Sequence, residues 1–62
     1  MRVWINDQAV DLIQGMTVRH ALIQVGLWQE IEKGATVLDE MGNEVGTDGA
    51  LEEKMRLTLK YP

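Results

Sequence analysis

The stretch "TVRHALIQVGL" is the clearest helix signal in the chain, and its shortness limits what the chain can fold into. Its apolar residues recur at i, i+3, i+4 and i+7, one face of an α-helix: Val18, Ala21, Leu22 and Val25. Thr17 is a good N-cap residue, and Gly26 can adopt the left-handed conformation that ends a helix. A helix of about eight residues is unstable alone, because the free-energy cost of nucleation exceeds the stabilisation that two turns provide. We therefore expect it to pack on a sheet.

The first twelve residues predict a β-hairpin. Residues 2–5, "RVWI", alternate and are rich in β-branched and aromatic side chains, and "QAVDL" at 8–12 alternates again. The pair Asn6-Asp7 between them tolerates left-handed backbone angles and suits a tight turn. The alternation assigns four side chains to the buried face, Val3, Ile5, Val10 and Leu12, and points Arg2 and Trp4 the other way.

The second half predicts further short strands. Residues 28–34 are expected to form an irregular helical turn with Trp28 and Ile31 facing inward, and residues 35–40 to form a third strand. A very short strand fits around Glu44-Val45, between turns marked by three glycines. Residues 55–61 alternate strongly, which directs Leu57, Leu59 and Tyr61 to one face and Arg56, Thr58 and Lys60 to the other.

All these apolar stripes are buried if the first and last strands lie side by side in parallel at the centre of a sheet, with the helix across one face. That arrangement is the β-grasp. The predicted fold class is therefore α+β, a single domain over residues 1–62. We expect a mixed sheet of four to five strands with one helix on one face, in ββαββ(β) order.

The composition and net charge argue against several classes of function. The chain has 62 residues, no Cys and a net charge of −4. Without Cys there is no disulfide, thiolate nucleophile or Cys-ligated zinc or iron–sulfur cluster. The acidic balance argues against binding nucleic acid or anionic membranes, which both require a basic surface. No apolar run is long enough to span a bilayer. We expect a soluble, cytoplasmic protein without a cofactor and without enzymatic activity.

The chain resembles β-grasp proteins of the ubiquitin-like superfamily, above all the small sulfur carriers of thiamine and molybdopterin synthesis (ThiS/MoaD type) and the fold of plant-type ferredoxins. The resemblance covers nearly the whole chain and rests on three stretches: "VWINDQAVDL", "GMTVRHALIQVGL" and "VLDEMGNEVGTDGALEEKMRLTL". These are mostly residues that determine the fold, so they carry little information on function.

Two departures from these families bear on function. Sulfur carriers end in Gly-Gly, because the terminal carboxylate must thread a narrow channel into an adenylating enzyme. Here the printed sequence ends in Lys60-Tyr61-Pro62, whose last residues are bulky and rigid. Ferredoxins need four Cys ligands, and the chain has none. A degenerate sulfur carrier and a docking piece of a larger redox enzyme remain as alternatives to an interaction module.

The sequence gives little support for a catalytic or metal site. His20, the one His, lies off the apolar stripe, and no nucleophile or orienting carboxylate can be assigned to it from the sequence. We therefore expect His20 to be a surface residue. The acidic residues of the second half do not follow the EF-hand spacing, which would place Asp39, Met41 and Asn43 at ligand positions 1, 3 and 5. We expect no metal site but a solvated acidic rim that could attract a basic partner: Asp39, Glu40, Glu44, Asp48, Glu52 and Glu53.

Trp4 is the most informative residue for function. It is expected on the sheet face opposite the helix, where the last strand would add two cations. The predicted partner-binding residues are Trp4, Arg2, Arg56 and Lys60. An exposed Trp among Arg residues is typical of interface anchors. The alternative is a local cation–π contact under neighbouring Arg and Lys stems. We predict an interface with a protein partner or with a second copy of the chain.

Overall fold

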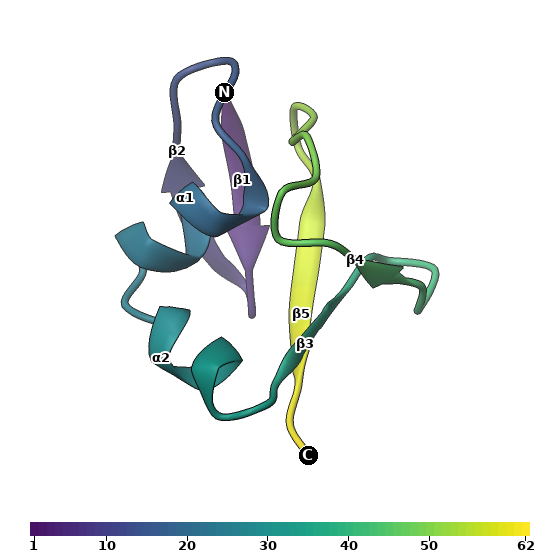
Figure 1. Cartoon of the computed structure of the whole chain (residues 1–62). Coiled ribbons are helices and arrows are strands. Elements are labelled where there is room, and N and C mark those ends of the chain that lie inside the picture. The colour runs from purple at the N-terminus through teal and green to yellow at the C-terminus, as the bar shows by residue number, and fades with distance from the viewer.

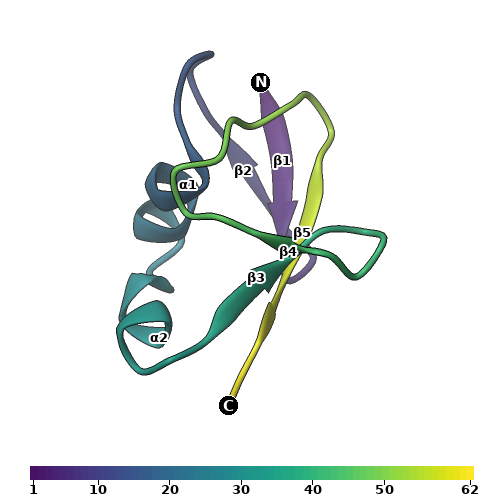
Figure 2. The same ribbon diagram turned by 45° about the vertical axis from the view of Figure 1, so that its right-hand side comes forward.

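The structure, a computed structural model, describes all 62 residues and contains five strands and two short helices (Figure 1). In chain order these are β1 (Arg2–Ile5), β2 (Gln8–Asp11), α1 (Val18–Gln24), α2 (Trp28–Glu32), β3 (Thr36–Leu38), β4 (Glu44–Val45) and β5 (Arg56–Lys60). Both helices lie on the same side of the sheet (Figure 2). The chain is therefore an α+β domain, as predicted.

The strands form one mixed sheet in the order β2-β1-β5-β3-β4. The first and last strands, β1 and β5, are central neighbours and run parallel, while every other pair is antiparallel. This topology is consistent with the β-grasp. It confirms the inference that the two ends of the sequence meet at the sheet centre.

The core lies between the sheet and the helices. It contains eleven buried residues, all apolar: Val3, Ile5, Val10, Leu12, Val18, Ala21, Leu22, Ala35, Val37, Leu57 and Leu59. The strand residues among them alternate with exposed or half-buried ones, which is the period-2 pattern read from the sequence. No polar side chain is buried, so hydrophobic packing accounts for the cohesion of the two layers.

The turn between β1 and β2 also anchors β5. Asn6 and Asp7 have φ of 49° and 67°, the left-handed values that a two-residue type I′ turn requires. The backbone N–H of Asn6 donates to the carbonyl of Leu57 at 2.9 Å. Its side-chain Oδ1 then accepts from the backbone N–H of Leu59 at 3.0 Å, and so adds one rung to the parallel ladder.

A side chain also extends this ladder at its other end. The carboxylate of Glu53 accepts a hydrogen bond of 2.6 Å from the backbone N–H of Arg2, and the carbonyl of Arg2 accepts one of 2.7 Å from the N–H of Lys54. Lys54 has φ of 64°, so a non-glycine residue takes the left-handed conformation that turns the chain into β5. The register of the central pair is thus held at both ends by side chains.

Helix α1 ends as its sequence predicts. Gly26 has φ of 77°. The N–H of Leu27 donates to the carbonyl of Leu22 at 2.9 Å, and that of Gly26 donates to Ile23 at 3.1 Å. These two bonds define a Schellman motif, in which the glycine reverses the chain and satisfies carbonyls that the last turn leaves free.

The start of α1 is capped both locally and by a distant segment. Thr17 occupies the N-cap position, as predicted, and forms a capping box with His20, in which each side chain faces the backbone N–H of the other residue. The loop after β4 supplies two further acceptors: the carbonyl of Gly49 accepts from Val18 at 3.1 Å, and that of Thr47 accepts from Arg19 at 2.8 Å. The helix is therefore also capped by a segment about thirty residues away in sequence, and no local sequence pattern predicts that contact.

The bounds predicted for two strands were wrong. The strand expected over 35–40 covers only Thr36–Leu38, because the Oδ1 of Asp39 accepts from the backbone N–H groups of Met41 and Asn43, both at 2.9 Å, and closes a turn. The last strand ends at Lys60, and Tyr61 is 51% exposed rather than buried, since it lies beyond the last pair with β3.

The segment expected as an irregular helical turn is the short helix α2, and its Trp28 and Ile31 pack half-buried against the core, as predicted.

Adjacent residues of α1 provide a test of this core. Leu22 is fully buried, so Leu22→Ala should cost about 2–5 kcal/mol of unfolding free energy through lost transfer energy and a residual cavity. Ile23 is 51% exposed, and Ile23→Ala should change stability by about 0.5 kcal/mol or less. Urea unfolding followed by circular dichroism measures both. Equal losses at the two positions would show that the helix presents a different face to the sheet.

A second test concerns Asn6. Asn6→Ala should cost about 2 kcal/mol, because alanine disfavours φ near 50° and cannot accept the bond from Leu59. Asn6→Gly should cost about 1 kcal/mol, because glycine keeps the turn and loses only the hydrogen bond. Thermal unfolding measures both variants. A glycine variant as stable as the wild type would mean that the side-chain rung contributes nothing.

Candidate functional site

The sheet face opposite the helices is the candidate site, because no element covers it (Figure 2). Alternation along the strands and the register of their pairs place ten side chains on this face, each exposed or half-buried. We name it the open sheet face: Ala9 and Asp11 from β2, Arg2 and Trp4 from β1, Arg56, Thr58 and Lys60 from β5, Thr36 and Leu38 from β3, and Glu44 from β4.

Trp4 and Arg56 form the centre of the open sheet face. They are register partners across the parallel pair, and the guanidinium carbon of Arg56 lies 4.5 Å from the centroid of the Trp4 ring. Such a contact contributes about 0.5–1 kcal/mol at an exposed site. The ring remains half-buried rather than covered. The local cation–π contact is therefore present, and part of the ring is still accessible to a partner.

Arg2 lies on the same face, but its charge is already matched. It is the register partner of Asp11 across β1 and β2, and its Nε and Nη2 donate to Oδ1 and Oδ2 of that carboxylate at 2.8 and 3.2 Å. The hydrogen bond from Arg2 holds the pKa of Asp11 below its usual value, and that of Arg2 is raised. Both side chains are solvated, so the pair orients the guanidinium and contributes little stability.

Lys60 lies at the far end of β5, opposite Thr36 of β3. It is four residues from Arg56, or about 13 Å along a strand. Lys60 is exposed and takes part in no ion pair. Of the four residues predicted for the site, the structure brings Trp4 and Arg56 into contact, places Arg2 beside them, and leaves Lys60 separate at the other end of the face.

The sequence prediction missed other members of this face. Leu38 is half-buried between Thr58 of β5 and Glu44 of β4, which are its register partners. Leu38 directly follows the buried Val37, so alternation alone would have assigned it to the open side. It adds a second apolar side chain across β5 from the tryptophan.

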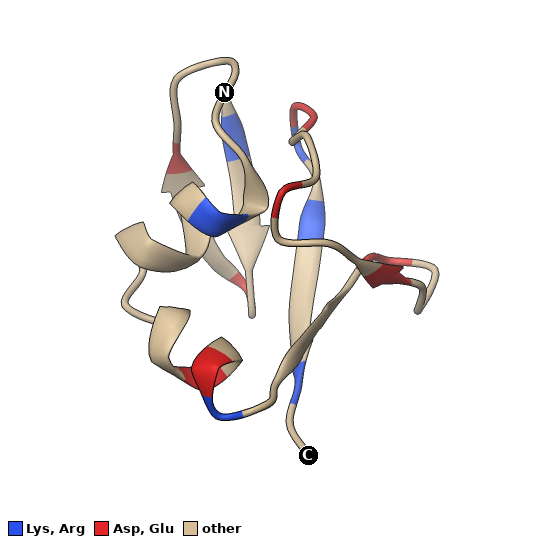
Figure 3. Cartoon of the chain, viewed as in Figure 1, with Lys and Arg blue, Asp and Glu red and all other residues tan.

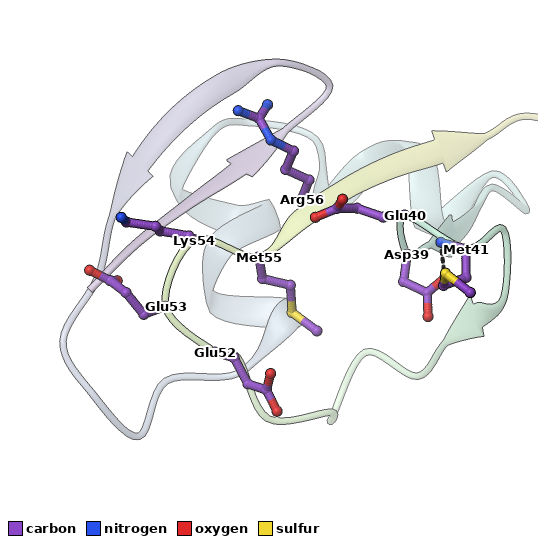
Figure 4. A pocket seen from close by; sticks show the side chains of 8 residues that line it. All are labelled: Asp39, Glu40, Met41, Glu52, Glu53, Lys54, Met55 and Arg56. Carbon is purple, nitrogen blue, oxygen red and sulfur yellow. Dashed lines mark hydrogen bonds between the residues drawn. The ribbon is translucent and has the colours of Figure 1, made fainter.

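A shallow hollow of about 270 Å³ borders this face (Figure 4). Its lining is mostly charged: Asp39, Glu40, Met41, Glu52, Glu53, Lys54, Met55 and Arg56. Figure 4 shows the guanidinium of Arg56 directed away from the carboxylate of Glu40. No group of three or more His, Asp or Glu side chains in the molecule lies close enough together to hold a metal ion. The acidic rim is therefore spread along the surface, as Figure 3 shows.

A second arginine–tryptophan pair lies on the helical layer. The guanidinium carbon of Arg19 lies 4.9 Å from the centroid of the Trp28 ring. A broad surface depression beside it is lined by five residues: Ile23, Gly26, Trp28, Gln29 and Glu32. The residue pattern assigns Trp28 only to the core. The sequence of a five-residue helix does not indicate which part of a large ring stays exposed.

His20 has a structural role at the start of α1. Its Nδ1 accepts a hydrogen bond of 2.9 Å from the backbone N–H of Thr17, so the ring proton is on Nε2. The hydroxyl of Thr17 lies 3.1 Å from the same nitrogen. The residue is exposed, as predicted, and Thr17 is its one hydrogen-bond partner; no carboxylate orients the ring.

Comparison with known proteins identifies no relative: no family model matches the chain, and no curated protein or solved structure matches it. Neither helix has the length and apolar character needed to cross a membrane. A proposed function therefore rests on the fold class and on the geometry of the surface.

The Arg2–Asp11 pair can be tested by titration. A depressed carboxyl pKa contributes stability above the pKa of the unfolded chain, about 3.9, and that contribution is lost as pH falls through the folded pKa. Arg2→Gln should therefore raise the pKa of Asp11 toward its ordinary value, as measured by NMR of its carboxyl carbon. Lys60→Gln, on the same face, should leave it unchanged. An unmoved Asp11 titration in Arg2→Gln would contradict the pairing.

Proposed function

We propose that this protein is a small, non-catalytic interaction module that binds a protein partner through the open sheet face. The observation that carries the proposal is the partly exposed Trp4 ring held under Arg56 at the centre of an uncovered sheet. Trp and Arg are the residue types most often found as energetic anchors of protein interfaces. Arg2 and Lys60 are the other proposed contacts. A catalytic role has less support, because no nucleophile, base and orienting group are bonded together.

The shape of the site also supports binding rather than catalysis. The open sheet face is a surface formed by five adjacent strands, not an enclosed pocket. Reactions generally require a cavity that excludes water and surrounds the substrate. A face of this kind suits a second protein surface, which can cover the ring and exclude water in the same step.

The sulfur-carrier alternative remains a proposal that rests on the resemblance. Its chemistry would act at the end of the chain, and Figure 1 shows the residues after β5 extending past the sheet. Sulfur carriers have a thin Gly-Gly tail, and the residues that follow β5 in the printed sequence are Tyr61 and Pro62. A reading frame that continues beyond Pro62 and ends in Gly-Gly would support this alternative.

The proposal can be tested by site-specific crosslinking in the cells that produce the protein. A benzoyl-phenylalanine residue at position 58, an exposed threonine of the open sheet face, should form an adduct with one defined partner, and excess unmodified chain should suppress it. The same residue at position 28, within the other arginine–tryptophan pair, is the matched control and should not form that adduct. The partner is then identified by mass spectrometry and purified.

Affinity for the purified partner decides the roles of the residues. Trp4→Ala and Arg56→Gln should each weaken binding by about 2 kcal/mol or more, roughly 30-fold, in calorimetry, while Arg19→Gln should not. Circular dichroism should show that all three variants are folded, because none of these residues is fully buried. An adduct at position 28 alone, or equal affinities for all variants, would exclude the open sheet face as the binding surface.

A further inference from the structure

The charges of the open sheet face are arranged in a pattern that distinguishes between classes of partner. Arg56 and Lys60 lie on the central strand β5, while Asp11 and Glu44 lie on the two edge strands. Asp11 is occupied by Arg2. The centre of the face is therefore cationic on a chain whose net charge is −4. Neither cation of β5 takes part in an ion pair within the chain.

Arg56 is oriented by its stacking on Trp4. A guanidinium over an aromatic ring keeps its N–H donors in the plane of the group, where they can bind a carboxylate in a bidentate manner. The stacking also directs Arg56 toward β1 and away from Glu40, one of the carboxylates of the bordering hollow (Figure 4). The contact therefore reduces the side-chain entropy that Arg56 loses when an external carboxylate binds.

We propose that the open sheet face binds an acidic segment of a partner protein, with one carboxylate on Arg56 and a second on Lys60. This inference rests on the proposed function and specifies the chemistry of the partner. The two cations are about 13 Å apart along β5, which matches two carboxylates four residues apart in an extended chain. An apolar side chain between them would lie over Thr58, with its register partner Leu38 on one side and Trp4, the register partner of Arg56, diagonally across on the other.

A second copy of this chain fits the face less well. Stacking two copies about a two-fold axis through β5 would place Arg56 and Lys60 of one copy over the same cations of the other. An extended acidic segment instead brings carboxylates to both cations.

The test is an NMR titration of the ¹⁵N-labelled full chain at low salt with three blocked pentapeptides. The probe is Glu-Ala-Leu-Thr-Glu, and the controls replace both Glu residues by Gln or by Lys. The Glu peptide should shift the amide signals of Trp4, Arg56, Thr58 and Lys60, with at least tenfold tighter binding than the Gln peptide. The shifts should disappear at 0.5 M salt, since the contacts are exposed charges. The chain has a net charge of −4 and so repels an acidic peptide over most of its surface. The position of the shifted signals therefore identifies the surface that the peptide binds.

Two variants complete the test. Arg56→Gln should weaken binding of the Glu peptide at least tenfold, whereas Arg19→Gln, which alters the other arginine–tryptophan pair, should leave it unchanged. Equal binding of the Glu and Gln peptides, shifts centred on Trp28, or no shift on the face would overturn the inference.

Two further outcomes would overturn the inference and leave the proposed function standing. Binding of the Lys peptide to the face would indicate a basic partner. Shifts of the same four residues that grow with protein concentration, without any peptide, would indicate a second copy.

Discussion

The parallel pairing of β1 with β5 is the interaction on which the rest of the structure depends. It joins the two ends of the chain, and no short turn can make such a pair. Side chains extend it at both ends, through Asn6 at one and Glu53 at the other. Once it forms, Ile5 and Leu57 lie next to each other in the core, and the helices have a surface to cover.

The same pairing creates the candidate site. A chain of this length has only two short helices, and both are used on one side of the sheet (Figure 2). No helix covers the other side. The strand residues that alternate with the core residues therefore form an exposed surface there. Because β1 and β5 are in register, Trp4 and Arg56 become neighbours although 52 positions separate them in the sequence. The core and the proposed interface thus arise from one strand pairing.

Much of the fold could be predicted because its signals are local. The alternation of β1 and β5, the turn at Asn6 and the glycine after α1 each depend on a few adjacent residues. The features that the sequence did not predict depend on contacts with segments distant in the sequence. Carbonyls of Thr47 and Gly49 add to the local cap of α1, and Tyr61 is exposed because β3 begins opposite Lys60 and offers Tyr61 no partner. Nothing in the sequence pattern indicated either result.

The sequence by itself determined which side chains share a face, because strand and helix periodicities are set by backbone geometry. It therefore placed Trp4, Arg2, Arg56 and Lys60 on the same side of a sheet. Only the tertiary structure decided their relations: Arg2 is paired with Asp11, Arg56 is stacked on Trp4, and Lys60 stands apart. The reason is physical, since pairings depend on the register between strands and on competition among neighbouring charges, and both are defined only when the chain is folded.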